Sequence, residues 1–489
     1  MTSLLDTRRV FLVIVALGLF AMAARSVTDP DVWWHLRTGQ LILQNHAVFR
    51  SDPYSFTKFG QPWVNHEWLS DALIFTLFRT TGWAGPIVTF AGVTSAAFML
   101  VFLRCAGRPY LAAAFTVWSA IASAPSWGVR PQTLSLLLAS LFLLLLNRSY
   151  ECPNVLWYTL PLMLLWVNLH AGFAIGIAFM VVFLVGDFLG IAFGFEEWSQ
   201  SRGRVKKLAA ALAACLVVVP LNPYGVQMYR YPFQTVDSSA MQTYIAEWFS
   251  PNFHQGMYTP VLLLMLAIFV AATISPRRLR PRELLLLSIT TWAALHSARH
   301  IPIYALVAAP ILSNLVYAWT REQNRLKAET KRPSTTLVRQ MFNGVALAAF
   351  LILGSLKVRN VLSTQTDVER HSFPVAAVSF LQAGQFSPQL FNNYNWGGYL
   401  IWKLYPEYRV CIDGRADLYG DKVMDQFASA YNISDPSWRP TLEKWQIETV
   451  ILPPDAPLAS ALRLRPSWNQ VYSDRQAVVL RRPQAQTGQ

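Results

Sequence analysis

The chain has 489 residues, of which 53% are hydrophobic and only 14% are charged, whereas soluble domains carry about 25% charged residues. This composition excludes an ordinary soluble protein, because most of the surface cannot face water. A net charge of +14 would favour nucleic-acid binding in a soluble protein, but here the basic residues lie mainly in short loops between apolar runs, so we predict no nucleic-acid partner.

Long apolar runs predict about eleven transmembrane helices. Several runs are shorter than the ~20 residues that a perpendicular helix needs, so flanking Trp, Tyr and Arg side chains must complete the span. The first run follows Arg8 and Arg9, and we interpret it as an uncleaved first helix rather than a signal peptide. The runs lie near residues 10–24, 84–103, 109–124, 131–147, 155–168, 172–193, 207–221, 258–274, 282–296, 301–319 and 341–357.

Lys and Arg in alternate loops predict the orientation of these helices. The positive-inside rule places the N-terminus in the cytoplasm of a bacterium, and an odd number of spans then places the C-terminal region on the periplasmic side of the inner membrane. The opposite loops carry only scattered charges, such as Arg130 and Arg299. The basic loops hold Arg8 and Arg9, Arg104 and Arg108, Arg148, Arg202 to Lys207, Arg277 to Arg282, and the tract from Arg321 to Arg339.

The predicted membrane domain covers residues 1–357 and contains a large first periplasmic loop at about residues 25–83. Two segments of this loop, Asp31–Gln44 and His66–Arg79, have partly helical apolar spacing. We expect both to form helices that lie along the membrane surface, with Trp side chains at the level of the lipid headgroups.

Residues 358–489 have a different composition, with frequent charges, Pro, Asn and Gln. Short β-type runs alternate there with helical stretches, which predicts a small periplasmic α/β domain. The fold class is therefore mainly α and polytopic, with a soluble α/β domain at the C-terminus. The β-type runs are Gln389–Phe391, Arg409–Ile412, Glu448–Leu452 and Ala477–Leu480, and the helical stretches include Asp421–Tyr431 and Trp438–Trp445.

Two carboxylates, Asp29 and Asp31, flank Pro30 just outside the first predicted span. At the boundary between water and lipid they fit a general base or the ligands of a divalent cation. They also fit a helix start, because Asp is a good N-cap, Pro suits the first helical position and a second Asp favours the helix dipole. One Asp can cap the helix while the other acts in chemistry.

An apolar first helix, an acidic pair that opens a large outer loop with surface helices, and many further spans together resemble the GT-C glycosyltransferases. This superfamily includes protein O-mannosyltransferases, aminoarabinose transferases and the catalytic subunits of oligosaccharyltransferases. The segment from Arg299 and His300 through Tyr304 to Pro310 also resembles the family, in which a basic residue opens a late span containing Tyr and Pro. The resemblance covers about residues 1–357, although the second surface helix begins Asn65-His66-Glu67-Trp68 where better-known members often have a His-Pro type segment.

The resemblance implies an inner-membrane enzyme that moves a sugar from a polyprenyl-phosphate carrier to a periplasmic acceptor. It assigns the catalytic base, or a metal ligand, to the first-loop acids, which are Asp31 and Asp29 here. We expect Asp31 to be the base and Asp29 chiefly the cap. The sequence specifies no certain cofactor, and a divalent cation such as Mg²⁺ or Mn²⁺, held by Asp29 and Asp31, is the candidate.

Further ionisable side chains are candidates for substrate binding. His35 lies one turn after Asp31, and a spacing of four puts Glu67 and Asp71 on one helix face. Basic groups at predicted outer helix ends suit a lipid-linked phosphate, and Arg299 is the leading candidate for it. Each of these residues has a plainer alternative: a solvated histidine, a polar helix start or an interfacial anchor. The candidates are His35, His66, Glu67, Arg130, His170, His296, Arg299 and His300.

The C-terminal region holds two motifs, Asn395-Trp396-Gly397-Gly398-Tyr399-Leu400 and Asp413-Gly414-Arg415-Ala416-Asp417. They resemble a family of uncharacterised bacterial membrane proteins with the same layout. Asp413, Arg415 and Asp417 are candidates to bind the acceptor or to dock the domain on the membrane part. We favour the plainer explanation, an internal salt-bridged turn.

Two other function classes compete with the transferase. A transporter needs polar or broken helices at the bilayer midplane, often in internal repeats, whereas the predicted spans are almost uniformly apolar. A noncatalytic membrane assembly protein needs none of the candidate groups and remains the main alternative.

Overall fold

The computed structural model describes residues 6–324 and 336–483. Most of the predicted basic tract from Arg321 to Arg339 lies outside the described residues. The chain divides into two compact units, which are described separately below. Unit 1 comprises Met1–Arg25, Ile87–Tyr229 and Ala246–Val361, and unit 2 comprises Ser26–Pro86, Arg230–Ile245 and Leu362–Gln489.

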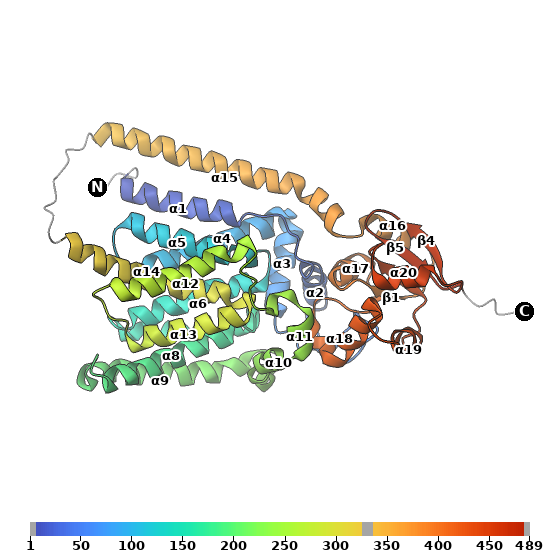
Figure 1. The fold of residues 1–489 in the computed structure, drawn as a ribbon, viewed down its shortest axis with the longest axis horizontal. Helices are drawn as coiled ribbons and strands as arrows, with labels where there is room; N and C mark the ends of the chain where they lie inside the picture. The colour runs from blue at the N-terminus through green and yellow to red at the C-terminus, as the bar shows by residue number, and fades with distance from the viewer. Residues whose placement is uncertain (1–5, 325–335, 484–489) are drawn as a thin grey trace, which may run out of the picture. The chain divides into compact units, whose positions relative to one another are not determined.

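Unit 1 is built from long helices that run alongside one another (Figure 1). Every predicted apolar run coincides with a helix, and several helices begin with Pro in their first turn, where its missing N–H costs nothing. The helices are α1 (Thr7–Ala23), α4 (Ala84–Arg104), α5 (Pro109–Ser123), α6 (Pro131–Arg148), α7 (Thr159–Leu169), α8 (Phe173–Ala192), α9 (Trp198–Val218), α12 (Thr259–Ile274), α13 (Pro281–His296), α14 (Ile301–Asn324) and α15 (Thr336–Ser372).

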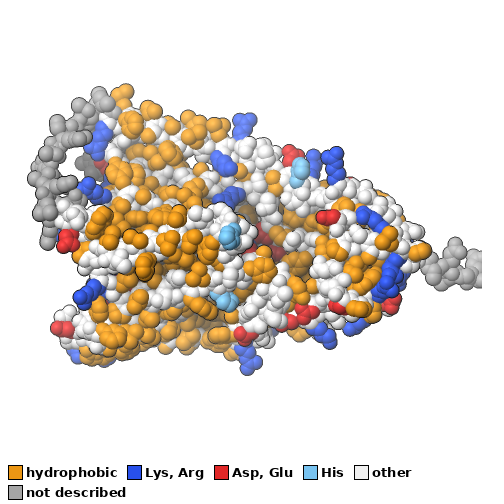
Figure 2. All heavy atoms as spheres, viewed as in Figure 1, with side chains coloured by type: hydrophobic (Ala, Val, Ile, Leu, Met, Phe, Trp, Pro, Cys, Tyr) orange, Lys and Arg blue, Asp and Glu red, His pale blue; other side chains and the backbone are white. Residues whose placement is uncertain are grey.

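Six helices among the described residues are long and apolar enough to cross a membrane. Hydrophobic side chains cover most of the visible face over these helices (Figure 2). The class of polytopic membrane protein is therefore confirmed, while the total of about eleven spans remains a prediction. The six helices are Ala84–Arg104, Pro131–Arg148, Phe173–Ala192, Gly256–Ile274, Ala298–Gln323 and Arg339–Ser372.

Unit 2 contains a five-stranded sheet in the order β2-β1-β3-β5-β4. Strands β2, β1 and β3 are parallel, and β5 and β4 continue the sheet antiparallel to their neighbours. All the predicted β-type runs are strands. The strands are β1 (Gln389–Asn392), β2 (Arg409–Val410), β3 (Thr449–Leu452), β4 (Asn469–Ser473) and β5 (Val478–Arg481), and the helices beside them are α16 (Val375–Ala383), α17 (Gly397–Leu404), α18 (Ala416–Asn432), α19 (Trp438–Lys444) and α20 (Pro457–Arg463) (Figure 1).

The first loop belongs to unit 2 and packs on the C-terminal sheet domain. It forms both predicted helices, α2 (Val32–Asn45) and α3 (Trp68–Thr81). Between them, the loop pairs with β2: Ser55 forms a parallel bridge with Val410, Phe56 N–H donates to the Val410 carbonyl over 3.0 Å, and Val410 N–H donates to the Tyr54 carbonyl over 3.2 Å. Two short helices, α10 (Tyr231–Asp237) and α11 (Ser239–Tyr244), complete the unit.

The transition at Lys357 does not end a helix, because α15 continues as far as Ser372. Polar residues sustain a helix in water as well as apolar ones do in lipid, so a change of composition marks a change of surroundings rather than of backbone. The boundary between residues 357 and 358 remains a prediction about where the membrane ends.

Candidate functional site

The candidate base, Asp31, stands at the N-terminus of α2. Its backbone N–H donates to Oδ1 of Asp29 over 2.9 Å, so the Asp29 side chain closes the turn around Pro30 that opens the helix. Asp31 itself is the N-cap residue but makes no side-chain cap hydrogen bond. Asp29 therefore caps the turn locally. Asp31 is half-buried, and its carboxylate makes no capping hydrogen bond to the first turn of α2.

One turn along α2, His35 is buried against two carboxylates of the α3 region. Its Nδ1 lies 2.6 Å from Oδ1 of Asp71, and its Nε2 lies 3.7 Å from Oε2 of Glu67. Asn65 Nδ2 donates to the other Asp71 oxygen over 2.8 Å. The spacing of four therefore places Glu67 and Asp71 together, as predicted, and His35 is a buried partner of both rather than a solvated residue.

Charge in this cluster favours a protonated imidazole. Burial lowers the pKa of His35, but the hydrogen bond to Asp71 and the charges of Asp71, Glu67 and Asp31 outweigh it, so the net pKa is raised. Burial raises the pKa of Asp71, and His35 offsets only part of that rise. The hydrogen bond between the two side chains joins α2 to α3.

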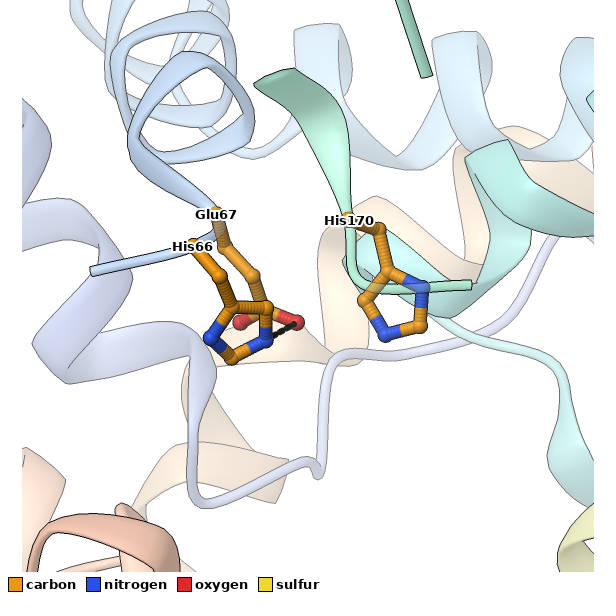
Figure 3. A group of neighbouring side chains, drawn as sticks. All are labelled: His66, Glu67 and His170. Atoms are coloured by element: carbon orange, nitrogen blue, oxygen red, sulfur yellow. Dashed lines mark ion pairs between the residues drawn. The ribbon is translucent and has the colours of Figure 1, made fainter. Parts of the chain in front are cut away.

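The start of α3 carries the next pair, His66 and Glu67. His66 Nε2 lies 3.2 Å from Oε1 of Glu67, and Figure 3 shows this ion pair as a dashed line. The His66 ring lies against Tyr231, with 4.2 Å between the ring centroids, and the Tyr231 hydroxyl donates to Oδ2 of Asp417 over 2.8 Å. Burial lowers the pKa of His66, but Glu67 first and then Asp417 raise it, and the net pKa is raised.

The Asp413-to-Asp417 motif forms a buried turn that also contacts the first loop. Asp413 accepts hydrogen bonds from the Arg415 backbone and guanidinium over 2.7–3.0 Å, and from the Tyr419 hydroxyl over 2.6 Å. Arg415 Nη1 donates to Oδ1 of first-loop Asp52 over 2.8 Å. Its guanidinium also lies 4.5 Å from the centre of the Trp63 ring. The same residues thus form an internal salt-bridged turn and a contact with the first loop.

Unit 1 holds the candidates for phosphate binding. Arg130, the N-cap of α6, pairs with Glu247, and Arg299 lies over the Trp248 ring with 5.3 Å from its Cζ to the ring centroid. Burial raises the pKa of Glu247, but Arg130 and then Arg299 outweigh it and the net pKa is lowered. The Trp248 and His300 rings lie edge to face at 6.3 Å. Arg130, Arg299 and His300 therefore gather around the Glu247–Trp248 segment.

Two further basic candidates, His296 and His170, also lie in unit 1. His296 is exposed at the last residue of α13, where its ring lies 5.3 Å from that of Trp292. His170 is buried after α7, and its Nδ1 lies 2.7 Å from Ser135 Oγ and accepts from Gly172 N–H over 2.9 Å. Trp166 donates to the same serine hydroxyl. This hydrogen-bonded chain joins α6 to the α7–α8 turn.

Several residues that build these sites were not predicted. Asp52 belongs to a Ser-Asp-Pro-Tyr stretch, which is a turn signal that gives no hint of its partner Arg415. Glu247 and Trp248 stand side by side in a loop, and an acid beside a Trp near basic outer residues would have been a usable signal.

Asp421 was also missed. It accepts four hydrogen bonds from Ser238, Ser239 and Ala240 at the start of α11. Asp425 follows Asp421 at a spacing of four along α18, which places both carboxylates on one helix face and could have been read from the sequence.

The fold is similar to that of an archaeal oligosaccharyltransferase, an enzyme of the kind that the sequence resemblance named. The structure is similar to that of the oligosaccharyltransferase of Archaeoglobus fulgidus in its apo form, with a TM-score of 0.53 and 13% identity over 91% of this chain and 69% of that one. The oligosaccharyltransferase AglB of the same organism, in complex with an inhibitory peptide and a dolichol-phosphate, gives a TM-score of 0.54 at 12% identity, over 90% of this chain and 69% of that one. ArnT from Cupriavidus metallidurans bound to undecaprenyl phosphate gives a TM-score of 0.49 at 12% identity, over 98% and 99%. No family model and no curated protein matches the sequence.

Proposed function

We propose that the protein is a GT-C glycosyltransferase that moves a sugar from a polyprenyl-phosphate carrier to an acceptor on the periplasmic side of the bacterial inner membrane. The observation that carries the proposal is the pair of acids at the start of α2, in which Asp29 closes the turn and Asp31 does not cap the helix. The fold shared with AglB, which binds a dolichol-phosphate, supports a polyprenyl-phosphate donor for this chain.

In the proposed reaction, a hydroxyl or amide of the acceptor attacks the anomeric carbon of the donor sugar. The bond from that carbon to the phosphate oxygen breaks, and polyprenyl phosphate leaves with the bonding electrons. Asp31 accepts the proton of the attacking group. His35, shared between Asp71 and Glu67, fixes α2 against α3 and so holds Asp31 in place.

A divalent cation, Mg²⁺ or Mn²⁺, fits the same acids, since hard cations prefer carboxylate oxygens. Asp29 and Asp31 would be its ligands, and the bound ion would stabilise the negative charge on the leaving phosphate. Asp29 also accepts a hydrogen bond from the Asp31 backbone N–H through its Oδ1, so the two acids are held close together at the start of α2.

The donor phosphate is proposed to bind at Arg299 in unit 1. Arg offers a planar fork of donors that suits phosphate oxygens, and it is always charged. Support comes from the surroundings, where Arg130, Arg299 and His300 gather near a single carboxylate, Glu247. Arginines at the end of a membrane helix suit an anionic headgroup, because they offer it charge-assisted hydrogen bonds.

The orientation with the N-terminus in the cytoplasm is part of the proposal. Reporter fusions at residues 105, 203 and 279 are expected to read as cytoplasmic, and a fusion after residue 360 as periplasmic. A cytoplasmic reading after residue 360 would place unit 2 on the wrong side for a lipid-linked donor and would refute the proposed function.

The activity test is sugar transfer by the purified full-length chain in detergent or liposomes. Polyprenyl-phosphate donors that carry different sugars are offered with a membrane extract as the source of acceptors, and the release of polyprenyl phosphate is measured. The parent chain is expected to release it, and Asp31→Asn is expected not to. Equal release by the parent chain, Asp31→Asn and Asp29→Asn would show that the first-loop acids are not catalytic.

A further inference from the structure

Three glycines of the two C-terminal motifs lie at points of very close approach. A Cβ atom on Gly397 would overlap the Ile412 carbonyl and Asp413, which fixes α17 against the Asp413 turn. A Cβ on Gly398 would overlap the Pro30 carbonyl, and one on Gly414 would overlap the carboxylate of Asp31. The motifs therefore bring the C-terminal domain into backbone contact with the residues that open α2.

The contact at Gly414 has a specific cause. The Gly414 backbone lies outside the left-handed region, so its conformation does not itself require glycine. Gly420, five residues after Arg415, is the opposite case: its φ is +65°, and a Cβ there would meet nothing within 4 Å. Glycine is required at position 420 by the backbone conformation. At position 414 it is required because Asp31 occupies the space that a side chain would need.

The turn that carries Gly414 is held on both sides. It follows β2, which pairs with the first loop through the Ser55–Val410 bridge. It is then tied to that loop again by Arg415, whose guanidinium joins Asp413 to Asp52 in a fully buried ion triad. Buried charges of this kind hold one geometry, because moving any member leaves an unpaired charge in a dry environment. Gly414 is thereby a fixed surface against which the Asp31 carboxylate rests.

We propose that the Asp413-Gly414-Arg415 turn positions the Asp31 carboxylate, with Gly414 as the contact and Arg415 as the residue that locks the turn in place. Resting on the proposed function, this assigns the C-terminal domain a direct part in the transferase site. The turn restricts the rotamers of Asp31, so that the carboxylate spends its time in the orientation that accepts the proton. Neither Gly414 nor Arg415 needs to touch the substrate.

A test of the contact requires no sugar transfer. Thermal unfolding of the full-length chain in detergent is compared for the parent, Gly414→Ala, Asp31→Ala and the double variant. Gly414→Ala is expected to lower the midpoint by several degrees in the parent, and by less than one degree when Asp31→Ala has removed the carboxylate. The control, Gly420→Ala, strains the backbone and is expected to lower the midpoint equally in both backgrounds.

Equal destabilisation by Gly414→Ala with and without the Asp31 carboxylate would overturn the proposal. If Gly414→Ala alone does not yield folded protein, the double variant decides instead. Recovery of folded protein on adding Asp31→Ala supports the contact, and no recovery overturns it.

A second test separates positioning from stability. In sugar transfer, Gly414→Ala is expected to lower kcat at least tenfold while KM for the donor stays within twofold, because orientation and not binding is lost. Gly420→Ala is expected to retain kcat. A kcat of Gly414→Ala equal to that of Gly420→Ala, with Asp31→Asn inactive, overturns the positioning proposal and leaves the proposed function standing. Full activity of Asp31→Asn refutes the proposed function, while the unfolding measurements still decide whether the contact exists.

Discussion

The acidic cluster of unit 2 and the basic cluster of unit 1 differ in how their charges are balanced. In unit 2, each acid has a buried basic partner, which defines a matched network: His35 lies against Asp71 and Glu67, and Arg415 lies against Asp413 and Asp52. In unit 1, the basic side chains Arg130, Arg299 and His300 gather near one carboxylate, Glu247, and one aromatic ring, Trp248.

We expect this difference to separate side chains that build the site from side chains that bind a ligand. Buried partners of opposite charge hold helices and turns in register. An excess of one charge stabilises an incoming ion of the opposite sign. Within unit 2, Asp31 stands at the start of α2 without capping that helix. We therefore expect most of the buried charges of unit 2 to be structural, and we propose chemistry for Asp31 and anion binding for Arg299.

The sharpest way to break this assignment is Asp31→Asn, which keeps the shape and removes the basicity. Loss of a general base lowers a rate by ~10²–10⁴-fold, and we expect that loss in polyprenyl-phosphate release. Asp29→Asn is the matched control, because its amide oxygen can still accept the Asp31 backbone N–H, and it should keep most of the activity. An active Asp31→Asn beside an inactive Asp29→Asn would reverse the roles of the two acids.

Arg415→Met tests whether the matched network of unit 2 is structural. Removing one partner of a buried ion pair costs about 3–5 kcal/mol, because Asp413 and Asp52 would remain buried and charged. We expect a large fall in the thermal midpoint of the purified chain. Arg439→Met is the control: Arg439 is exposed and lies 5.2 Å from the Trp438 ring, so its loss should change the midpoint little. A midpoint unchanged by Arg415→Met would show that the triad does not hold the turn.

Arg299→Gln tests the basic cluster of unit 1. Loss of a charged hydrogen bond should weaken binding of the donor lipid by ~1.5–3 kcal/mol, and Arg299→Lys should restore only part of it because the planar fork is gone. The measurement is binding of polyprenyl phosphate to the purified chain, with expression and the thermal midpoint as checks on folding. Unchanged binding by a well-folded Arg299→Gln would make Arg299 an anchor of its helix at the membrane interface.

Much of the fold was predictable from the sequence, because periodicity and apolar length are local properties. Every apolar run is a helix, and α2, α3 and four of the strands lie where their patterns predicted. β4 was missed, since Asn469–Ser473 is a polar edge strand that is mostly exposed and lacks a buried face. The orientation in the membrane and the number of spans remain predictions.

The candidate site was predictable only where its partners lie close together in sequence. The pairing of Glu67 with Asp71 follows from helical spacing. The ion pair between Asp52 and Arg415, and the approach of Gly414 to Asp31, join segments far apart in the chain. Nothing local records such contacts, so the sequence left the Asp413-to-Asp417 motif divided between acceptor binding, docking and an internal turn.

The pH dependence of stability tests the matched network of unit 2 at the His35–Asp71 pair. Both pKa values are raised in the folded protein, so the folded state binds protons more tightly than the unfolded state does. The stabilisation from His35 is therefore fully present below its unfolded pKa of about 6.5 and is lost as the pH rises through the folded pKa. For one proton, the free energy of unfolding should fall by at most about 1.4 kcal/mol per pH unit in that window.

His35→Gln should flatten this dependence on the alkaline side of pH 6.5, as measured by thermal midpoints across a pH series. His46→Asn is the control, because His46 is exposed and ends α2 with a φ of +52°, which Asn tolerates. A parent slope that survives in His35→Gln would assign the titration to another group, with His66 the next candidate because its pKa is also raised.

The smallest expected effect concerns the Tyr231 hydroxyl, which links the His66–Glu67 pair to the C-terminal domain. It donates to Asp417 over 2.8 Å while the ring lies against His66. Tyr231→Phe keeps the ring and removes one hydrogen bond to a charged acceptor, so the free energy of unfolding should fall by ~0.5–3 kcal/mol, and toward the lower end because Asp417 is only half-buried and water can replace the donor. Tyr244→Phe offers a matched control, since its hydroxyl donates to Asp425 over 3.0 Å from an exposed position, where the loss should be smaller still.

The two variants should also differ in the titration of His66, because Asp417 raises the pKa of His66. Tyr231→Phe should shift the titration of His66 in a ring-proton spectrum, and Tyr244→Phe should not. An identical His66 titration in both variants would mean that Tyr231 contributes only ring packing. Asp417 would then act within the sheet domain and not on the start of α3.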